Sequence, residues 1–156
     1  MIEIKAPQPV PIFPFPKKLL FLAGSSEMDT AEQWQERVVH ALADTNVTIL
    51  NPRRDDWDAS WVQSIENEKF VEQVEWEFEG MERAWQIVMY FSPGTKSPIT
   101  LLELGLYAND GRLAVCCPDG FWRKGHVEVV CRRYGVRLYH SLDSLIEELK
   151  SDRSLS

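Results

Sequence analysis

The chain has 156 residues, of which 44% are hydrophobic and 26% charged, a composition typical of one globular domain with a sizeable core. Its net charge of −7 disfavours nucleic acid and anionic membranes as main partners, because both attract surfaces rich in Lys and Arg. No stretch resembles a membrane span, and residues 1–16 lack the basic and apolar regions of a signal peptide, so we expect a cytoplasmic protein.

Cysteine and histidine give no sign of a metal or redox site. The three cysteines form no C-x-x-C pair, and two of them fall within an expected strand, which favours buried, reduced thiols. No metal-ligand spacing joins the three histidines. The residues are Cys116, Cys117, Cys131, His40, His126 and His140. The sequence therefore predicts no metal and no cofactor.

The amino-terminal part is rich in proline, so we expect residues 1–17 to form an extended arm rather than a helix. The arm is expected to lie on its own domain; the alternative is a proline motif that binds another protein. An α/β domain is expected over residues 18–150, followed by a short tail over 151–156.

Beyond the arm, short apolar strands alternate with helices five times. The expected strands are 19–23, 47–50, 87–91, 113–117 and 136–139. The expected helices begin near Thr30, cover about 70–84, 97–109 and 127–134, and end with one capped by Ser141. Strands separated by helices imply a parallel sheet with right-handed crossovers. We predict a flavodoxin-like, three-layer α/β domain with a five-stranded parallel sheet, in the order 2-1-3-4-5.

The helix expected at 97–109 carries an acid on its second turn. Ser97 suits the N-cap and Pro98 the first helical position. At about 100° per residue, Thr100, Glu103 and Tyr107 share one face of this helix. The preceding strand is apolar throughout and reads as a buried parallel strand, and ligands bind beyond the carboxyl ends of such strands. The pattern therefore predicts that Glu103 faces a binding site.

A second acid is expected on the helix at 70–84. Glu77 lies about 60° from the centre of the apolar face of that helix, which predicts a half-buried carboxyl group. Two interpretations remain open: Glu77 is a boundary residue that reaches solvent, paired with Arg83, or it is an acid of the binding site.

Two loops at strand ends add further candidate groups. Residues 51–58 combine two arginines, three aspartates and a tryptophan, and such groups suit phosphate, sugar or base recognition. The alternative is an internally paired surface loop. Residues 22–26 offer small side chains and backbone N–H groups, without a dinucleotide fingerprint or a P-loop lysine. The candidate binding residues are Gly24, Ser25, Asn51, Arg53, Asp55, Trp57, Ser97 and Thr100.

Taken together, the segments 21–25, 51–54, 73–77 and 97–105 resemble the nucleoside 2-deoxyribosyltransferase-like family, over about residues 19–149. The resemblance implies a flavodoxin-like fold, cleavage of the N-glycosidic bond of a small-molecule nucleoside or nucleotide, and a homo-oligomer. In the family's enzymes a glutamate in a Glu-Leu-Gly-Tyr-Ala-like helix attacks the anomeric carbon. Residues 103–108 are similar, which implies that Glu103 is the nucleophile. We expect Glu77 to protonate the departing base; the alternative proton donor is a carboxylate of the loop.

One difference keeps other functions open. The family's enzymes usually carry an Asp-x-Gly-Thr arrangement that leads to the glutamate, whereas the matching positions here are Ser97, Ile99 and Thr100. The alternative is therefore a non-catalytic nucleotide-binding or sensing module of the same fold. A third reading is an assembly module that associates through the Pro-rich arm.

Overall fold

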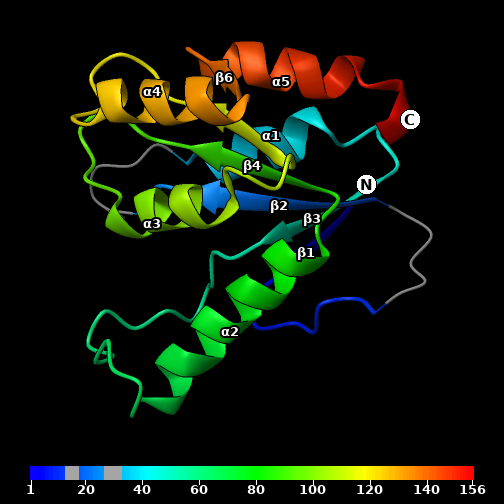
Figure 1. The fold of residues 1–156 in the computed structure, drawn as a ribbon. Helices are drawn as coiled ribbons and strands as arrows, with labels where there is room; N and C mark the ends of the chain where they lie inside the picture. The colour runs from blue at the N-terminus through cyan, green and yellow to red at the C-terminus, as the bar shows by residue number, and fades with distance from the viewer. Residues whose placement is uncertain (13–17, 27–32) are drawn as a thin grey trace.

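The computed structural model describes residues 1–12, 18–26 and 33–156. Within them, six parallel strands form one sheet, in the order β1-β3-β2-β4-β5-β6 (Figure 1). The strands are β1 (Ile2–Lys5), β2 (Lys18–Gly24), β3 (Val47–Asn51), β4 (Gln86–Tyr90), β5 (Leu113–Cys116) and β6 (Arg137–Tyr139). The helices are α1 (Trp34–Ala41), α2 (Glu68–Arg83), α3 (Pro98–Tyr107), α4 (Lys124–Tyr134), α5 (Leu142–Ser151) and the 3-10 helix η1 (Arg153–Leu155).

The helices cover both faces of the sheet, which gives three layers. One apolar core joins the sheet to α2, α3 and α4, and the other joins it to α1 and α5. Strand β2 shows the origin of the two cores, since Phe21 belongs to the first and Leu20 and Leu22 belong to the second. Side chains alternate between faces along a strand, so a strand covered on both sides is apolar throughout.

The predicted three-layer α/β domain is confirmed, and the order predicted for the five expected strands corresponds to β3-β2-β4-β5-β6. The sheet nevertheless has six strands rather than five. The additional strand is β1, at the start of the Pro-rich arm, which pairs in parallel with β3, with Ile2 opposite Thr48. The arm was predicted to be extended, which a strand is. Its partner β3 lies more than 40 residues away in the sequence, so the pairing depends on the tertiary fold.

The rest of the described arm lies on α2 of its own domain. The indole Nε1 of Trp76 donates to the carbonyl oxygen of Gln8 at 2.6 Å. Arg83 Nη1 donates to the carbonyl oxygens of Val10 at 3.2 Å and Pro11 at 3.1 Å. Because Val10 is also buried, both polar and apolar contacts hold the arm to the helix.

Three helix starts bear on the predictions. Ser97 precedes α3 as expected, but its backbone is left-handed (φ 46°, ψ 54°) and its side chain makes no capping hydrogen bond. Ser141 does cap α5, because its hydroxyl accepts from the backbone N–H of Ser144. The start expected near Thr30 lies outside the described residues.

No helix in the described part of the chain has the length and apolar character that crossing a membrane requires.

Gly24, at the end of β2, has no room for a side chain. Its φ is 154°, and an added Cβ would lie 2.5 Å from the carbonyl oxygen of Tyr90 and 2.7 Å from the Trp34 ring. We expect Gly24→Ala to lower the free energy of unfolding by about 2 kcal/mol or more, because strand and core must shift. The matched control is Gly105→Ala in α3, where an added Cβ would have no atom within 4 Å apart from its chain neighbours and the backbone of its own helix.

The control should raise the free energy of unfolding by about 0.5 to 1 kcal/mol, because alanine loses less backbone entropy in a helix. Urea denaturation of both variants and of the unchanged protein provides the comparison. Equal midpoints for Gly24→Ala and the unchanged protein would contradict the tight approach of β2 to β4.

Candidate active site

The side chain of Glu103, on the second turn of α3, is buried, with only 8% of the residue exposed. Thr100, one turn earlier on the same face, is 3% exposed. The apolar residues on the outer face of α3 are the exposed ones: Ile99, Leu102 and Leu106. The helix therefore turns its carboxylate-bearing face toward the domain and three aliphatic side chains toward solvent, the opposite of an ordinary amphipathic surface helix.

Burial changes the acidity of Glu103. Loss of hydration raises the pKa of its carboxyl group to about 8, and the negative charge of Glu77 adds to the effect. No hydrogen bond or ion pair from another residue in the described ranges reaches this carboxyl group. An acid without a cation or donor beside it, and out of water, is neutral over much of the physiological pH range.

Glu77 reaches the same place from α2. It is half-buried, and burial raises the pKa of its carboxyl group, while a hydrogen bond from Gln73 opposes the rise. The Gln73 amide nitrogen Nε2 donates to Glu77 Oε1 at 3.0 Å. Arg83, the surface partner considered for Glu77, forms its ion pair with Glu79 instead, at 2.7 Å. These contacts favour an acid of the binding site over a solvated boundary residue.

The charge of Glu77 affects the ionisation of Glu103. Glu77 and Glu103 come from helices on the same side of the sheet, and they lie close enough for the charge of one to raise the pKa of the other. When two carboxyl groups share a poorly hydrated space, the first proton leaves more readily than the second. The pair thus has a singly ionised form in which one carboxylate lies beside one neutral acid.

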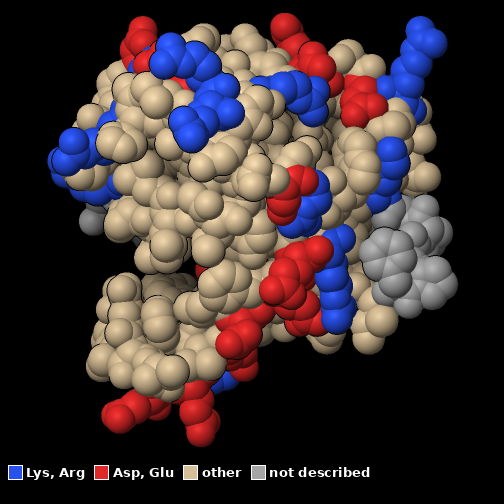
Figure 2. All heavy atoms as spheres, in the orientation of Figure 1, with Lys and Arg blue, Asp and Glu red and all other residues tan. Residues whose placement is uncertain are grey.

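A hollow opens on this side of the molecule. Figure 2 shows it between the body of the domain and the loop that joins β3 to α2 (residues 52–67, here the cleft loop), with acidic atoms visible at its back. In the same orientation, α3 lies above the hollow and the first half of α2 lies beside it (Figure 1). The two helices that carry Glu77 and Glu103 therefore border the hollow.

A cluster of hydroxyl groups joins the carboxyl ends of β2 and β4. Ser25 Oγ lies 2.6 Å from Ser97 Oγ and 3.2 Å from Thr95 Oγ1, and the Ser92 N–H donates to Ser25 Oγ at 2.7 Å. All four residues are buried. The cluster fixes the start of α3, and with it the position of Glu103, at the end of the sheet where open α/β folds bind ligands.

The candidate residues of the cleft loop, and Asn51 directly before it, differ in their surroundings. Asn51 is buried, and its Nδ2 donates to Glu3 Oε1 at 2.9 Å while its Oδ1 accepts from the Arg53 N–H at 3.1 Å. Asp55 is exposed and pairs with Lys5 at 3.1 Å. Trp57 is 37% exposed, with its ring centre 4.9 Å from that of Trp61. Asn51 thus ties the arm to the loop, while Trp57 keeps part of an aromatic face open.

Two residues of the site were missed by the sequence analysis. The Arg54 side chain is 1% exposed and pairs with Asp56 at 2.9 Å and Glu72 at 2.8 Å, so it anchors the cleft loop to α2. No local pattern distinguishes it from Arg53. Gln73 holds Glu77, and here a signal did exist, because a residue four positions earlier on a helix lies on the same face.

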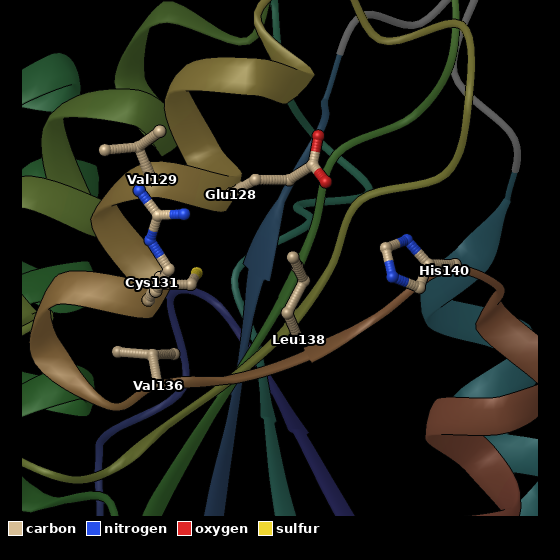
Figure 3. A pocket seen from close by; sticks show the side chains of 7 residues that line it. Glu128, Val129, Cys131, Val136, Leu138 and His140 are labelled. Carbon is tan, nitrogen blue, oxygen red and sulfur yellow. The ribbon is translucent and has the colours of Figure 1, made fainter.

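Other hollows of the described surface lie away from the two acids. One, of about 290 Å³, lies between α4 and β6, with a floor of Cys131, Val136 and Leu138 and with Glu128 and His140 beside it (Figure 3). Another, of about 510 Å³, lies between α1 and α5. Neither is lined by residues of α2 or α3. The three cysteines are buried, as expected.

A comparison with family models decides the assignment. The model described as nucleoside 2-deoxyribosyltransferase like matches residues 17–121, which include both acids and the cleft loop. The chain belongs to the nucleoside 2-deoxyribosyltransferase-like family. The match ends before α4, so the nucleoside 2-deoxyribosyltransferase-like part comprises β2 to β5 and the helices between them.

A solved structure supports the fold independently. The crystal structure of a conserved protein from Enterococcus faecalis V583 superimposes with a TM-score of 0.61 and 13% sequence identity, covering 86% of this chain and 98% of that one. At this identity the likeness concerns the fold alone. A search of curated proteins found no match.

We expect Glu103→Gln to stabilise the protein, and to do so more as pH rises. Below pH about 4.5 the carboxyl group is protonated in both folded and unfolded chains, so it contributes no pH dependence. Between pH about 4.5 and 8 the unfolded chain releases the proton first, so the unchanged protein loses stability with rising pH. The variant avoids this loss, which we place at about 2 to 4 kcal/mol near pH 8.

Denaturation midpoints at pH 5, 6, 7 and 8 measure the effect. Glu75→Gln is the matched control, because Glu75 is exposed on the neighbouring helix α2 and its replacement should follow the unchanged protein. A difference between Glu103→Gln and the unchanged protein that stays constant with pH would contradict a buried, ionisable Glu103.

Proposed function

We propose that this protein cleaves the N-glycosidic bond of a nucleoside or nucleotide and transfers the (deoxy)ribosyl group to another base or to water. The observation that carries the proposal is the proximity of two poorly hydrated acids, buried Glu103 of α3 and half-buried Glu77 of α2, on helices that border a surface hollow. Family membership supports it, since the matched region contains both acids. The sugar is held in transit as an ester of Glu103.

The reaction needs one carboxylate and one neutral acid. In the first step Glu103 attacks the anomeric carbon C1′, the C1′–N bond breaks with its electron pair moving to the base, and Glu77 donates a proton to the departing nitrogen. In the second step water or a second base attacks C1′, releases the Glu103 carboxylate, and returns a proton to Glu77. The configuration at C1′ is inverted twice and therefore retained.

The reaction uses one of the two singly ionised forms of the pair, the one in which Glu77 holds the proton and Glu103 is the carboxylate. While Glu77 is neutral it exerts no repulsion on Glu103, so the nucleophile ionises more easily in the microstate in which the acid holds the proton. Poor hydration then helps the chemistry, because a carboxylate with few water contacts gains more from a nearby positive charge. The oxocarbenium-like transition state of glycosyl transfer supplies that charge.

The remaining groups are assigned to substrate binding. Trp57 offers its open aromatic face to the base, and Arg53 and Asp55 offer polar groups from the cleft loop. We assign the wall of the binding site near the strand ends to Gly24, Ser25, Asn51, Ser97 and Thr100, which lie at or after the ends of β2 and β3 and at the start of α3. The expected homo-oligomer and cytoplasmic location stay predictions; the exposed aliphatic side chains on α3 are consistent with the former.

Release of free base from a panel of nucleosides and nucleoside monophosphates, followed by chromatography, tests the proposal. We expect Glu103→Gln to lower kcat by about 10³-fold or more, since no covalent intermediate can form, and Glu77→Gln to lower it by about 10²- to 10⁴-fold. Glu75→Gln is the control and should retain activity. A 2-deoxy-2-fluoro nucleoside should leave its sugar on the peptide that contains Glu103, detected by mass spectrometry.

Full base release by Glu103→Gln would remove Glu103 from the mechanism. Capture of the sugar on the peptide that contains Glu77 would exchange the assigned roles of the two acids. No base release from any member of the panel by the unchanged protein would argue against catalysis.

The pH dependence follows from the pair. The active form has lost one proton, so kcat/KM should fall on the alkaline side with an apparent pKa near 8, where the second proton leaves. It should also fall at low pH, where both acids are protonated. A pH–rate profile of the unchanged protein measures both limbs. A rate that keeps rising through pH 9 would mean that no neutral acid takes part.

A non-catalytic nucleotide-binding or sensing module is the second candidate. It is favoured by the buried hydroxyl of Ser97, which occupies a position where the family's enzymes carry an acid and lies within the hydroxyl cluster. Nucleosides or nucleotides would then raise the melting temperature without release of base. Stabilisation together with base release would favour the enzyme.

A further inference from the structure

Gln73 of α2 connects the cleft loop to the acid Glu77. The residue is only 7% exposed, and its amide nitrogen Nε2 donates to two acceptors, the carbonyl oxygen of Pro52 at 2.8 Å and Glu77 Oε1 at 3.0 Å. A primary amide has two N–H groups, so both donors are in use. Its oxygen Oε1 is buried and without a hydrogen-bond partner in the described structure.

The two acceptors set the orientation of the amide. If the amide were rotated by 180°, its oxygen would face the carbonyl oxygen of Pro52, which is also an acceptor, and the Glu77 carboxylate would lose its donor. The observed orientation leaves one buried acceptor unpaired, which costs free energy. Gln73 thus leaves its own Oε1 unpaired, and in return both of its N–H groups form hydrogen bonds, one to Pro52 and one to Glu77.

This arrangement has a chemical consequence for Glu77. Because Oε1 accepts the amide N–H, the proton of the neutral acid is favoured on the other oxygen, Oε2. The hydrogen bond also stabilises the carboxylate and opposes the effect of burial on the Glu77 pKa. Gln73 therefore restricts both the rotation of the carboxyl group and the oxygen that carries its proton.

The anchor of Gln73 is itself held in place. Pro52 follows Asn51, whose side chain donates to Glu3 of the arm. Arg54, two residues after Pro52, pairs with Glu72, the residue next to Gln73 on α2. The start of the cleft loop thus contacts two adjacent residues of α2, Glu72 and Gln73, and Gln73 is hydrogen-bonded to Glu77.

We propose that Gln73 is a positioning residue, which transmits the position of the cleft loop to Glu77 and presents the Glu77 proton on Oε2 to the departing base. The inference rests on the proposed function for its last step. Its structural part, the control of Glu77 by Gln73, concerns the protein without substrate and can be measured there.

Titration of the glutamate side-chain carboxyl groups by 13C NMR, in the substrate-free protein, tests the structural part. We expect Gln73→Met, which keeps the length but has no donor, to raise the pKa of Glu77 and to lower that of Glu103, since Glu77 then repels it less at a given pH. Unchanged titration of both acids in the folded variant would overturn the inference.

The matched control is Gln35→Met in α1. Gln35 is also a buried helical glutamine with an unpaired Oε1, but it lies in the helix layer on the other side of the sheet. Its replacement should leave both titrations as in the unchanged protein, while its effect on the melting temperature shows the cost of altering a buried glutamine away from the acids. Equal changes in both variants would overturn the inference.

Kinetics test the last step. With a nucleoside whose base requires protonation, Gln73→Met should lower kcat by about 10- to 100-fold with little change in KM. With a 4-nitrophenyl (deoxy)riboside, whose leaving group needs little protonation, the loss should be under about threefold. Equal losses on the two substrates would overturn the role in proton delivery.

The two proposals fail in different ways. If the unchanged protein releases no base but Gln73→Met still shifts both titrations, the proposed function fails and the control of Glu77 by Gln73 stands. If the unchanged protein is active and Gln73→Met alters neither the titrations nor the ratio of the two kcat values, the positioning role fails and the proposed function stands.

Discussion

The poor hydration of two neighbouring carboxyl groups is the constraint on which the rest of this site depends. Glu103 is buried without a cation or hydrogen-bond donor from the described residues, and the charge of Glu77 adds to the cost of ionising it. In such a pair the first proton leaves more readily than the second, so one form holds a single proton. A carboxylate and a neutral acid side by side are the two groups that the proposed glycosyl transfer needs, and here both come from glutamate.

The fold creates this environment by bringing distant segments to one end of the sheet. The two acids lie on helices that belong to successive crossovers, on either side of β4, and both helices cover the same face. The hydroxyl cluster of Ser25 and Ser97 then ties the end of β2 to the start of α3. The sheet thus sets the positions of Glu77 and Glu103, and the loss of water around their carboxyl groups raises their pKa values.

The cleft loop is held from several directions. Arg54 pairs with Glu72 and Asp56, Gln73 reaches the Pro52 carbonyl, and Asn51 contacts the arm. A buried arginine contributes geometry more than stability, because removing it from water offsets much of the gain from its ion pairs. The arrangement accordingly favours one placement of the loop relative to α2, which matters where the loop borders the acid.

Function and stability are opposed at Glu103. A buried acid that ionises late reduces the stability of the folded chain as pH rises, since the unfolded chain ionises freely. Active sites commonly retain such costs, because the groups that would relieve them would also remove the reactivity. A cation beside Glu103 would stabilise the fold and, in the proposed mechanism, weaken the nucleophile.

The sequence by itself determined the strand and helix alternation, the relative order of five strands and the existence of two acids on helix faces, because periodicity and strand-end position are local properties. It also places Gln73 on the same helix face as Glu77, because the two residues are four positions apart. The tertiary structure alone decided that the arm adds β1, that Arg54 rather than Arg53 anchors the cleft loop, and that Ser97 joins a hydroxyl cluster instead of capping α3. Each of these depends on partners far away in the chain, and the energy of a buried polar group is set by those partners rather than by its neighbours in sequence.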